Sequence, residues 1–209
     1  MVFVKVCGIT GPEDAHLAAE SGADAIGFLF AESPRRVSVE RAREISAALP
    51  PEVARVGVFV NASDKEVLRT AREAGLDYAQ LHGDETPDTV AAVREGGVKV
   101  VKALRVRDAE SLARMDGYAA DLYLLDSFSA KARGGTGERF DWALAEALKG
   151  CDNILISGGI TPENVGEALD FFEPYGVDAS SSLERAPGEK DEERVRRFVS
   201  AARNRKSQA

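Results

Sequence analysis

Three side chains capable of acid–base chemistry stand where apolar, strand-like runs end. Cys7 closes such a run near the start of the chain, Asp126 ends a second, and His82 follows a third. An ionised cysteine can act as a nucleophile, a metal ligand or a proton-abstracting base, although free cysteines are commonly just small buried residues. An aspartate here could cap the next turn, or act as a general acid if burial raises its pKa. We interpret His82 as a supporting residue of its loop.

Two stretches of small residues have the composition of an anion site. Residues 156–160 read Ile-Ser-Gly-Gly-Ile, and residues 179–182 read Ala-Ser-Ser-Ser. Glycines let the backbone approach a ligand closely, serines add hydroxyl donors, and helix N-termini favour anions. Each stretch alone is also ordinary turn chemistry. The prediction of a phosphate site therefore depends on both stretches lying in neighbouring loops.

Two further segments could complete a site. Arg35 and Arg36 form either solvated surface or a guanidinium group aimed at a carboxylate. Residues 127–142 include three glycines and are too many for a simple turn, which is typical of a loop that covers a substrate. We expect Trp142, at the end of this loop, to be a packing anchor.

The elements that must position these residues alternate regularly along the chain. Short apolar runs, several nearly continuous, alternate with amphipathic helical patterns, as expected for parallel strands covered on both faces. Helix starts are predicted at Thr10 and Ser63, each followed three residues later by glutamate, and at Thr86 and Thr161, each followed by proline. The predicted strands are residues 2–6, 25–30, 54–60, 78–81, 98–104, 122–126, 153–157 and 176–180.

Eight strand–helix pairs in 209 residues predict one α/β domain, a (β/α)8 TIM barrel spanning residues 1–209 with a frayed C-terminal end. The alternative is a doubly wound open sheet, which the count of eight and the lack of a Gly-x-Gly-x-x-Gly motif disfavour. In a barrel, residues that follow the strands share the C-terminal face, where active sites are built. Cys7, His82, Asp126 and Asp178 would meet there, whereas Cys151 would lie at the opposite end, too far for a disulfide.

The composition limits the class of protein. The net charge of −8 argues against a nucleic-acid partner, because phosphate backbones bind clustered positive charge. No apolar run approaches the roughly 20 residues that span a bilayer, and the N-terminus has no signal-peptide pattern. Two cysteines and two histidines have no metal-ligand spacing. We expect a cytoplasmic protein, monomeric or homodimeric, with no membrane partner and no metal.

Taken together, the motifs resemble those of the phosphoribosylanthranilate isomerases, the family that carries out the Amadori rearrangement of tryptophan biosynthesis. The resemblance covers essentially the whole chain and depends on the ordered set KVCGIT, GADAIGF, SPRRVS, VGVFVN, QLHGDE, LLDS, GGTGERFDW, ISGGITPENV and VDASSSLE. It implies a small phosphorylated substrate and no cofactor. Two alternatives stay open: another phosphosugar isomerase or epimerase built on the same barrel, and a non-catalytic phosphosugar-binding domain.

The resemblance also implies roles for individual residues. Cys7 would be the general base and Asp126 the general acid, while Arg35, rather than Arg36, would hold the substrate carboxylate. Asp178 would orient sugar hydroxyls. The phosphate would bind the loops that contain Gly158, Gly159, Ser180 and Ser181.

Two expectations follow from these roles. A free cysteine has a pKa near ~8.5, so a base at neutral pH predicts local stabilisation of the Cys7 thiolate. The family usually has glycine where this chain has Ser182, so Ser182 should carry backbone strain or weaken phosphate binding if that position needs a positive φ or close phosphate approach.

Overall fold

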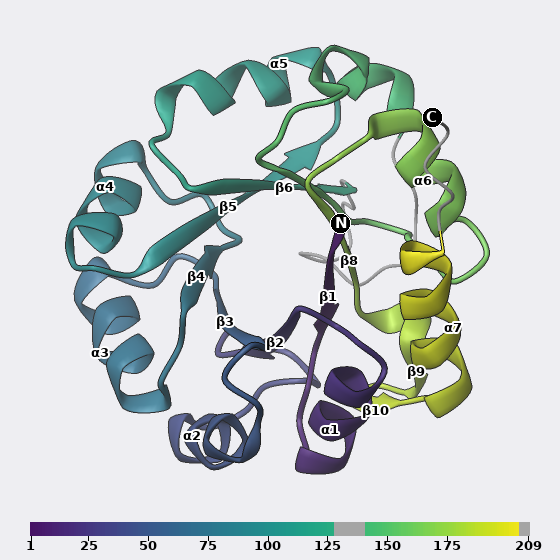
Figure 1. Cartoon of the computed structure of the whole chain (residues 1–209). Coiled ribbons are helices and arrows are strands. Elements are labelled where there is room, and N and C mark those ends of the chain that lie inside the picture. The colour runs from purple at the N-terminus through teal and green to yellow at the C-terminus, as the bar shows by residue number, and fades with distance from the viewer. Residues whose placement is uncertain (128–140, 205–209) are drawn as a thin grey trace.

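Eight parallel strands close into a barrel in a computed structural model that describes residues 1–127 and 141–204 (Figure 1). Neighbouring strands pair in chain order, and β1 also pairs with β8. This closure excludes the doubly wound open sheet. The strands are β1 (Phe3–Cys7), β2 (Ala25–Leu29), β3 (Ala54–Phe59), β4 (Tyr78–Leu81), β5 (Lys99–Val106), β6 (Leu122–Ser127), β7 (Ile154–Ile156) and β8 (Gly176–Ala179).

Helices form a ring outside the strands, as Figure 1 shows along the barrel. The α-helices are α1 (Pro12–Glu20), α2 (Val39–Ala48), α3 (Asp64–Ala74), α4 (Pro87–Glu95), α5 (Ala109–Ala113), α6 (Val165–Phe172) and α7 (Glu192–Arg203). Short 3₁₀ helices are η1 (Arg114–Gly117), η2 (Trp142–Leu148) and η3 (Ser181–Leu183). A small antiparallel hairpin of β9 (Glu184–Ala186) and β10 (Glu189–Lys190) precedes α7 and is an addition to the plain repeat.

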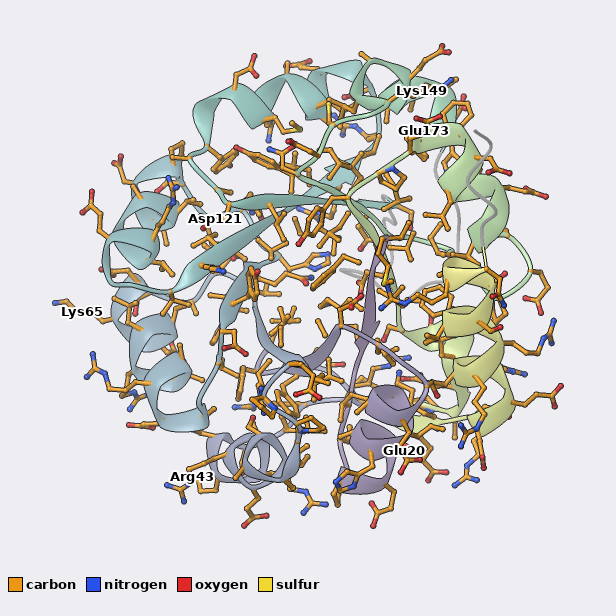
Figure 2. The ribbon with its side chains drawn as sticks, in the orientation of Figure 1. Glu20, Arg43, Lys65, Asp121, Lys149 and Glu173 are labelled. Carbon is orange, nitrogen blue, oxygen red and sulfur yellow. The ribbon has the colours of Figure 1, made fainter. Side chains whose placement is uncertain are left out.

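The predicted strands are all present, with ends displaced by two residues or fewer. The alternation of side chains along β1 shows how the strands are covered on both faces. Val4 and Val6 point outward into the apolar layer between strands and helices, whereas Phe3 belongs to a cluster inside the barrel. Charged side chains such as Glu20, Arg43 and Lys65 project from the outer faces of the helices (Figure 2).

Two of the four predicted helix starts are confirmed. The Ser63 hydroxyl accepts a hydrogen bond from the Glu66 N–H, and Thr86 caps α4 in the same way before its proline. At the other two starts the predicted threonine caps are wrong because the hydroxyl groups have other partners, although Pro12 does stand in the first turn of α1. Thr10 Oγ1 donates to the Gly188 carbonyl, and α1 begins after Gly11. Thr161 caps only a turn, and α6 begins at Val165.

Candidate functional site

A cavity of about 610 Å³ lies at the C-terminal ends of the barrel strands. The cavity lining includes all the residues that the sequence predicted for the site: Cys7, Arg35, Asp126, Gly158, Gly159, Asp178, Ser180 and Ser181. Cys151 precedes β7 and so lies toward the opposite end of the barrel, and both cysteines are free, as expected. The fold therefore brings together side chains from strands and loops far apart in the sequence.

Cys7 is the last residue of β1 and is 6% exposed. It shares the interior face of the strand with Phe3 and Lys5, because successive residues of a strand alternate between faces. On the neighbouring strand, a Cβ at Gly27 would lie 2.6 Å from Cys7 Sγ. Only glycine leaves room there for the thiol, so Gly27 is a structural partner of Cys7.

The electrostatic surroundings of Cys7 correct one expectation. Burial raises the pKa of the Cys7 thiol, and the ammonium groups of Lys5 and Lys190, which act to lower that pKa, do not offset the burial. Asp178 raises the thiol pKa further. The expected stabilisation of the thiolate is therefore wrong for this structure, because removal from water outweighs the nearby positive charge.

Asp126, in β6, is held on both carboxylate oxygens. His82 Nε2 lies 3.1 Å from Asp126 Oδ2, and Oδ1 accepts a hydrogen bond of 2.9 Å from the Ser127 N–H. Gln80 Nε2 lies 2.9 Å from His82 Nδ1 and donates to it, which leaves the imidazole proton on Nε2, facing Asp126. His82 thus has a supporting role, as the sequence predicts, but its side chain contacts Gln80 in β4 and Asp126 rather than its own loop.

The loop after β4 that carries His82 has its own internal support. Glu85 accepts hydrogen bonds from the N–H groups of Gly83 and Asn61, and Lys102 Nζ donates to Glu85 Oε2 at 2.7 Å. Lys102 also donates to the carbonyls of Leu81 and Gly83. Since Lys102 and Glu85 are almost fully buried, this ion pair fixes the backbone on either side of His82.

Asp178 stands at the interior end of β8, opposite Lys5 in the register of β1 and β8. Lys5 Nζ donates to Asp178 Oδ1 at 2.8 Å, and Ser157 Oγ donates to Oδ2 at 3.2 Å. Burial lowers the pKa of Lys5, but the charges of Asp178 and Cys7 raise it more, so the pKa of Lys5 is raised overall. The pair is therefore an ammonium–carboxylate pair in which Asp178 lines the cavity and Lys5 lies behind it.

Residues 4–201 match the family model described as N-(5'-phosphoribosyl)anthranilate isomerase. A protein of that name from Rubrobacter xylanophilus is 65% identical over 206 residues, covering 98% of this chain and all of the relative. The chain belongs to the N-(5'-phosphoribosyl)anthranilate isomerase family. Its members are isomerases, and so is this chain.

Solved structures of the family share the barrel. The Thermotoga maritima phosphoribosylanthranilate isomerase is 41% identical, with a TM-score of 0.89 over 97% of this chain and 98% of the relative. A second, 40% identical with a TM-score of 0.86 over 97% and 98% of the two chains, is described as a complex with reduced 1-(o-carboxyphenylamino)-1-deoxyribulose 5-phosphate. That ligand carries a carboxylate at one end and a phosphate at the other.

Of the two adjacent arginines in this isomerase, Arg35 faces the cavity. Its side chain is 14% exposed and lines the cavity, whereas Arg36 is exposed and lies outside the lining. Arg35 Nε and Nη2 donate to the carboxylate of Glu184, which is buried, and Glu184 in turn accepts from Lys190 Nζ. Hydrogen bonding to Glu184 raises the pKa of Arg35.

The small-residue loops after β7 and β8 also face the cavity. Gly158 and Gly159 both have positive φ values, 71° and 73°. A Cβ at Gly158 would come within 2.8 Å of Asp126 Oδ1 and would meet the Ser127 backbone, so this glycine also leaves room for the predicted acid. The two loops lie beside each other because β7 pairs with β8.

Ser182 carries no backbone strain. Among the described residues, positive φ outside glycine occurs only at Asn61 and Glu173, so the expected strain at Ser182 is wrong. Instead, Ser182 Oγ donates a hydrogen bond of 2.6 Å to the carbonyl of Ile160. This bond links the loop after β8 to the loop after β7. Any effect of Ser182 on phosphate binding stays a prediction.

Several residues of the site were not predicted from the sequence: Lys5, Gly27, Gln80, Glu184 and Lys190. Lys5 carried a signal, because a lysine in the middle of a buried strand needs a charged partner. Glu184 carried none, since its contact with Arg35 joins residues 149 positions apart.

Two further predictions concern the chain around the site. Trp142 packs against Phe171 and Phe172, with ring centroids 5.8 and 5.6 Å apart, so its prediction as a packing anchor is confirmed. The covering loop predicted over residues 127–142 falls mainly in residues 128–140, and the frayed end in residues 205–209; both lie outside the described residues. None of the described helices has the combined length and apolarity needed to cross a membrane.

Proposed function

We propose that the chain converts N-(5'-phosphoribosyl)anthranilate to 1-(o-carboxyphenylamino)-1-deoxyribulose 5-phosphate in tryptophan biosynthesis, with Asp126 as general acid and Cys7 as general base. The observation that carries the proposal is a thiol, a carboxyl group and an arginine facing one cavity in a member of this isomerase family. The reaction takes place in the cytoplasm, and the enzyme is a monomer or a homodimer.

In the first step, Asp126 protonates the ribose ring oxygen. The bond between that oxygen and C1′ breaks, and the anthranilate nitrogen supplies the electron pair that forms the iminium group. His82, hydrogen-bonded to Asp126 Oδ2, orients the carboxyl group.

In the second step, the Cys7 thiolate removes the proton from C2′. The electron pair of that bond forms a C1′–C2′ double bond and neutralises the iminium, giving an enolamine. Tautomerisation moves the hydroxyl proton to C1′ and leaves a ketone at C2′. The iminium acidifies the C2′ proton, so the chemistry needs no redox cofactor or metal.

The pKa of the Cys7 thiol bears on this second step. A raised pKa makes the thiolate scarcer at neutral pH, but it also makes that thiolate a stronger base. The ammonium of Lys5 limits the rise without cancelling it. The proposal therefore requires the rate to increase as pH rises toward the thiol pKa.

The other site residues bind different parts of the substrate. Arg35 binds the anthranilate carboxylate, because a guanidinium fork matches a carboxylate. Asp178 orients the sugar hydroxyl groups. The phosphate binds the loops with Gly158, Gly159, Ser180 and Ser181, in the position after strands seven and eight where barrels of this kind frequently bind phosphate.

The test supplies phosphoribosylanthranilate, made in situ from anthranilate and its phosphoribosyl donor, and follows the loss of substrate fluorescence. Turnover with a product of unchanged mass and a ketone at C2′ is the expected result. Turnover of another phosphosugar in its place would favour a sister barrel enzyme. Binding of phosphosugars with no turnover would favour the non-catalytic alternative.

A further inference from the structure

The hairpin β9–β10 carries two buried charged residues that face the site but do not line the cavity. Glu184 and Lys190 have side chains 4% and 0% exposed, and neither is part of the cavity lining. Lys190 Nζ lies 2.9 Å from Glu184 Oε1 and donates to the Ser180 carbonyl at 3.2 Å. Burying such charges is costly, so each must be paired, and their position behind the site calls for an explanation.

The third member of this cluster is Arg35, which does line the cavity. Arg35 Nε lies 2.8 Å from Glu184 Oε1, and Arg35 Nη2 lies 2.7 Å from Glu184 Oε2. This two-point contact uses one edge of the guanidinium group. Nη1 has no partner among the described residues, so the other edge, formed by Nη1 and Nη2, is available for a second carboxylate.

The position of the Arg35 side chain near Cys7, the predicted base, is fixed by close packing. A Cβ placed on Gly8 would come within 2.9 Å of Arg35 Cδ and 2.8 Å of Ser180 Oγ. Gly8 also has a φ of +82°. The aliphatic part of Arg35 therefore crosses directly above the residue that follows Cys7, and Glu184 holds its far end.

The hairpin itself is anchored on both sides. It lies beside α1 and α7 (Figure 1). The Lys190 N–H donates to Asp14 in α1, and Arg194 in α7 donates to the Glu184 carbonyl at 2.7 Å. Thr10 adds a 2.6 Å bond to the Gly188 carbonyl. Glu184 is thus fixed to two helices, which makes it a rigid support for a long, otherwise flexible arginine.

We propose that Glu184, backed by Lys190, is a positioning residue that orients Arg35 and thereby sets the preference of the site for a substrate with a carboxylate. The inference rests on the proposed function. With two cations and one carboxylate, the cluster keeps one net positive charge, whereas Arg35 and Glu184 alone would be neutral and would attract an anionic group less. Lys190 also joins this cluster to the phosphate loop through Ser180.

The test compares two ligands by calorimetry. One is reduced 1-(o-carboxyphenylamino)-1-deoxyribulose 5-phosphate, and the other is its phenylamino counterpart, which lacks the carboxylate. Glu184→Gln keeps an oxygen for Lys190 but can place an amide NH₂ group against Arg35 Nη2. The preference for the carboxylate ligand should fall about tenfold, the worth of one charge-assisted hydrogen bond, while the affinity for the counterpart changes less than about twofold.

The control is Glu189→Gln, the same substitution on the same hairpin in an exposed pair with Arg185, which should alter neither affinity. If Glu184→Gln does not fold, Glu184→Asp is the test variant. Aspartate keeps the negative charge but is shorter by one methylene group, so the carboxylate is withdrawn from Arg35. The preference for the carboxylate ligand must then still fall. An unchanged preference, or equal weakening of both ligands, would overturn the inference. Failure of the unsubstituted chain to bind either ligand would instead overturn the proposed function.

Discussion

At the C-terminal end of β1, a thiol and an ammonium group share the interior face of one strand. Cys7 and Lys5 are both buried, and Lys5 is paired with Asp178 across the junction of β1 and β8. The positive charge that could stabilise a thiolate is therefore already shared with a carboxylate. Burial prevails, and the structure favours the neutral thiol.

This balance predicts the pH dependence of thiol reactivity. In a Cys151→Ser background, alkylation of Cys7 by iodoacetamide should reach half its maximal rate above the ordinary thiol pKa of about 8.5, because burial raises the pKa. Lys5→Met should move that midpoint higher, since a charge that lowers the pKa is removed. Lys102→Met, which removes another buried lysine, should leave the midpoint unchanged. A Cys7 midpoint below about 8.5 would contradict the proposed balance.

The same shift has a consequence for stability. Because the pKa of Cys7 is raised on folding, its contribution to the free energy of unfolding is fully present below the unfolded thiol pKa. That contribution is lost as pH rises from about 8.5 through the folded pKa.

At the scale of the elements, glycines at strand ends leave the space that the site residues occupy. A Cβ at Gly158 would come within 2.3 Å of the Ser127 backbone nitrogen and 2.8 Å of the Asp126 carboxylate. Gly166, in α6, has nothing within 4 Å of such an atom. A side chain at position 158 would therefore clash with its neighbours, whereas position 166 has room for one.

Substitution by alanine at these two positions should therefore change the free energy of unfolding in opposite directions. Gly158→Ala should lower the free energy of unfolding by about 1–3 kcal/mol, through strain at positive φ and overpacking, and should lower kcat by displacing Asp126. Gly166→Ala should raise it by about 0.5–1 kcal/mol, through helix propensity, with no change in kcat. Urea unfolding and steady-state kinetics of both variants check this. Equal stability of the two variants would contradict the packing described here.

The elements that could be predicted from the sequence were those with local physical causes. Strands were predictable because nearly continuous apolar runs are required where both faces are covered. The starts of α3 and α4 were predictable because their caps are made within three residues. Those at Thr10 and Thr161 were not, since the Thr10 hydroxyl bonds to residue 188, far along the chain, and the Thr161 hydroxyl caps only a turn.

The same distinction applies to the site. Cys7, Asp126 and the loops after β7 and β8 could be predicted to face one cavity, because strand ends in a barrel share one face. The ion pairs behind them could not, since they join side chains that only the closed fold brings together. The charge balance at Cys7 was mispredicted for a related reason: the degree of burial depends on the whole barrel.

At the scale of the molecule, closure of the barrel joins the two ends of the chain. Arg203, in the last turn of α7, donates to the carbonyls of Val2 and Gly22 and contacts Asp24 Oδ2 at 2.6 Å. Asp24 also accepts from the Val4 N–H at 2.7 Å. The final helix is thus tied to the first strand, whose other end carries Cys7.

Removing this tie should weaken the whole fold. Arg203→Ala should lower the free energy of unfolding by about 1–3 kcal/mol, because two carbonyls and a carboxylate lose a charged donor. Arg196→Ala, in the exposed pair with Glu192 on the same helix, should change it by less than about 0.5 kcal/mol. Thermal and urea unfolding measure both variants. Equal effects would mean that α7 is held by its apolar face alone.

In the proposed mechanism, one carboxyl group and one thiol divide the acid and base steps of the rearrangement. The most direct test measures turnover of phosphoribosylanthranilate by the unsubstituted chain, Cys7→Ser, Asp126→Asn and the control Cys151→Ser. We expect kcat to fall by about 10²-fold or more in Cys7→Ser and Asp126→Asn, and to be unchanged in Cys151→Ser. Near-normal turnover by either Cys7→Ser or Asp126→Asn, with the unsubstituted chain active, would contradict the assignment of that residue.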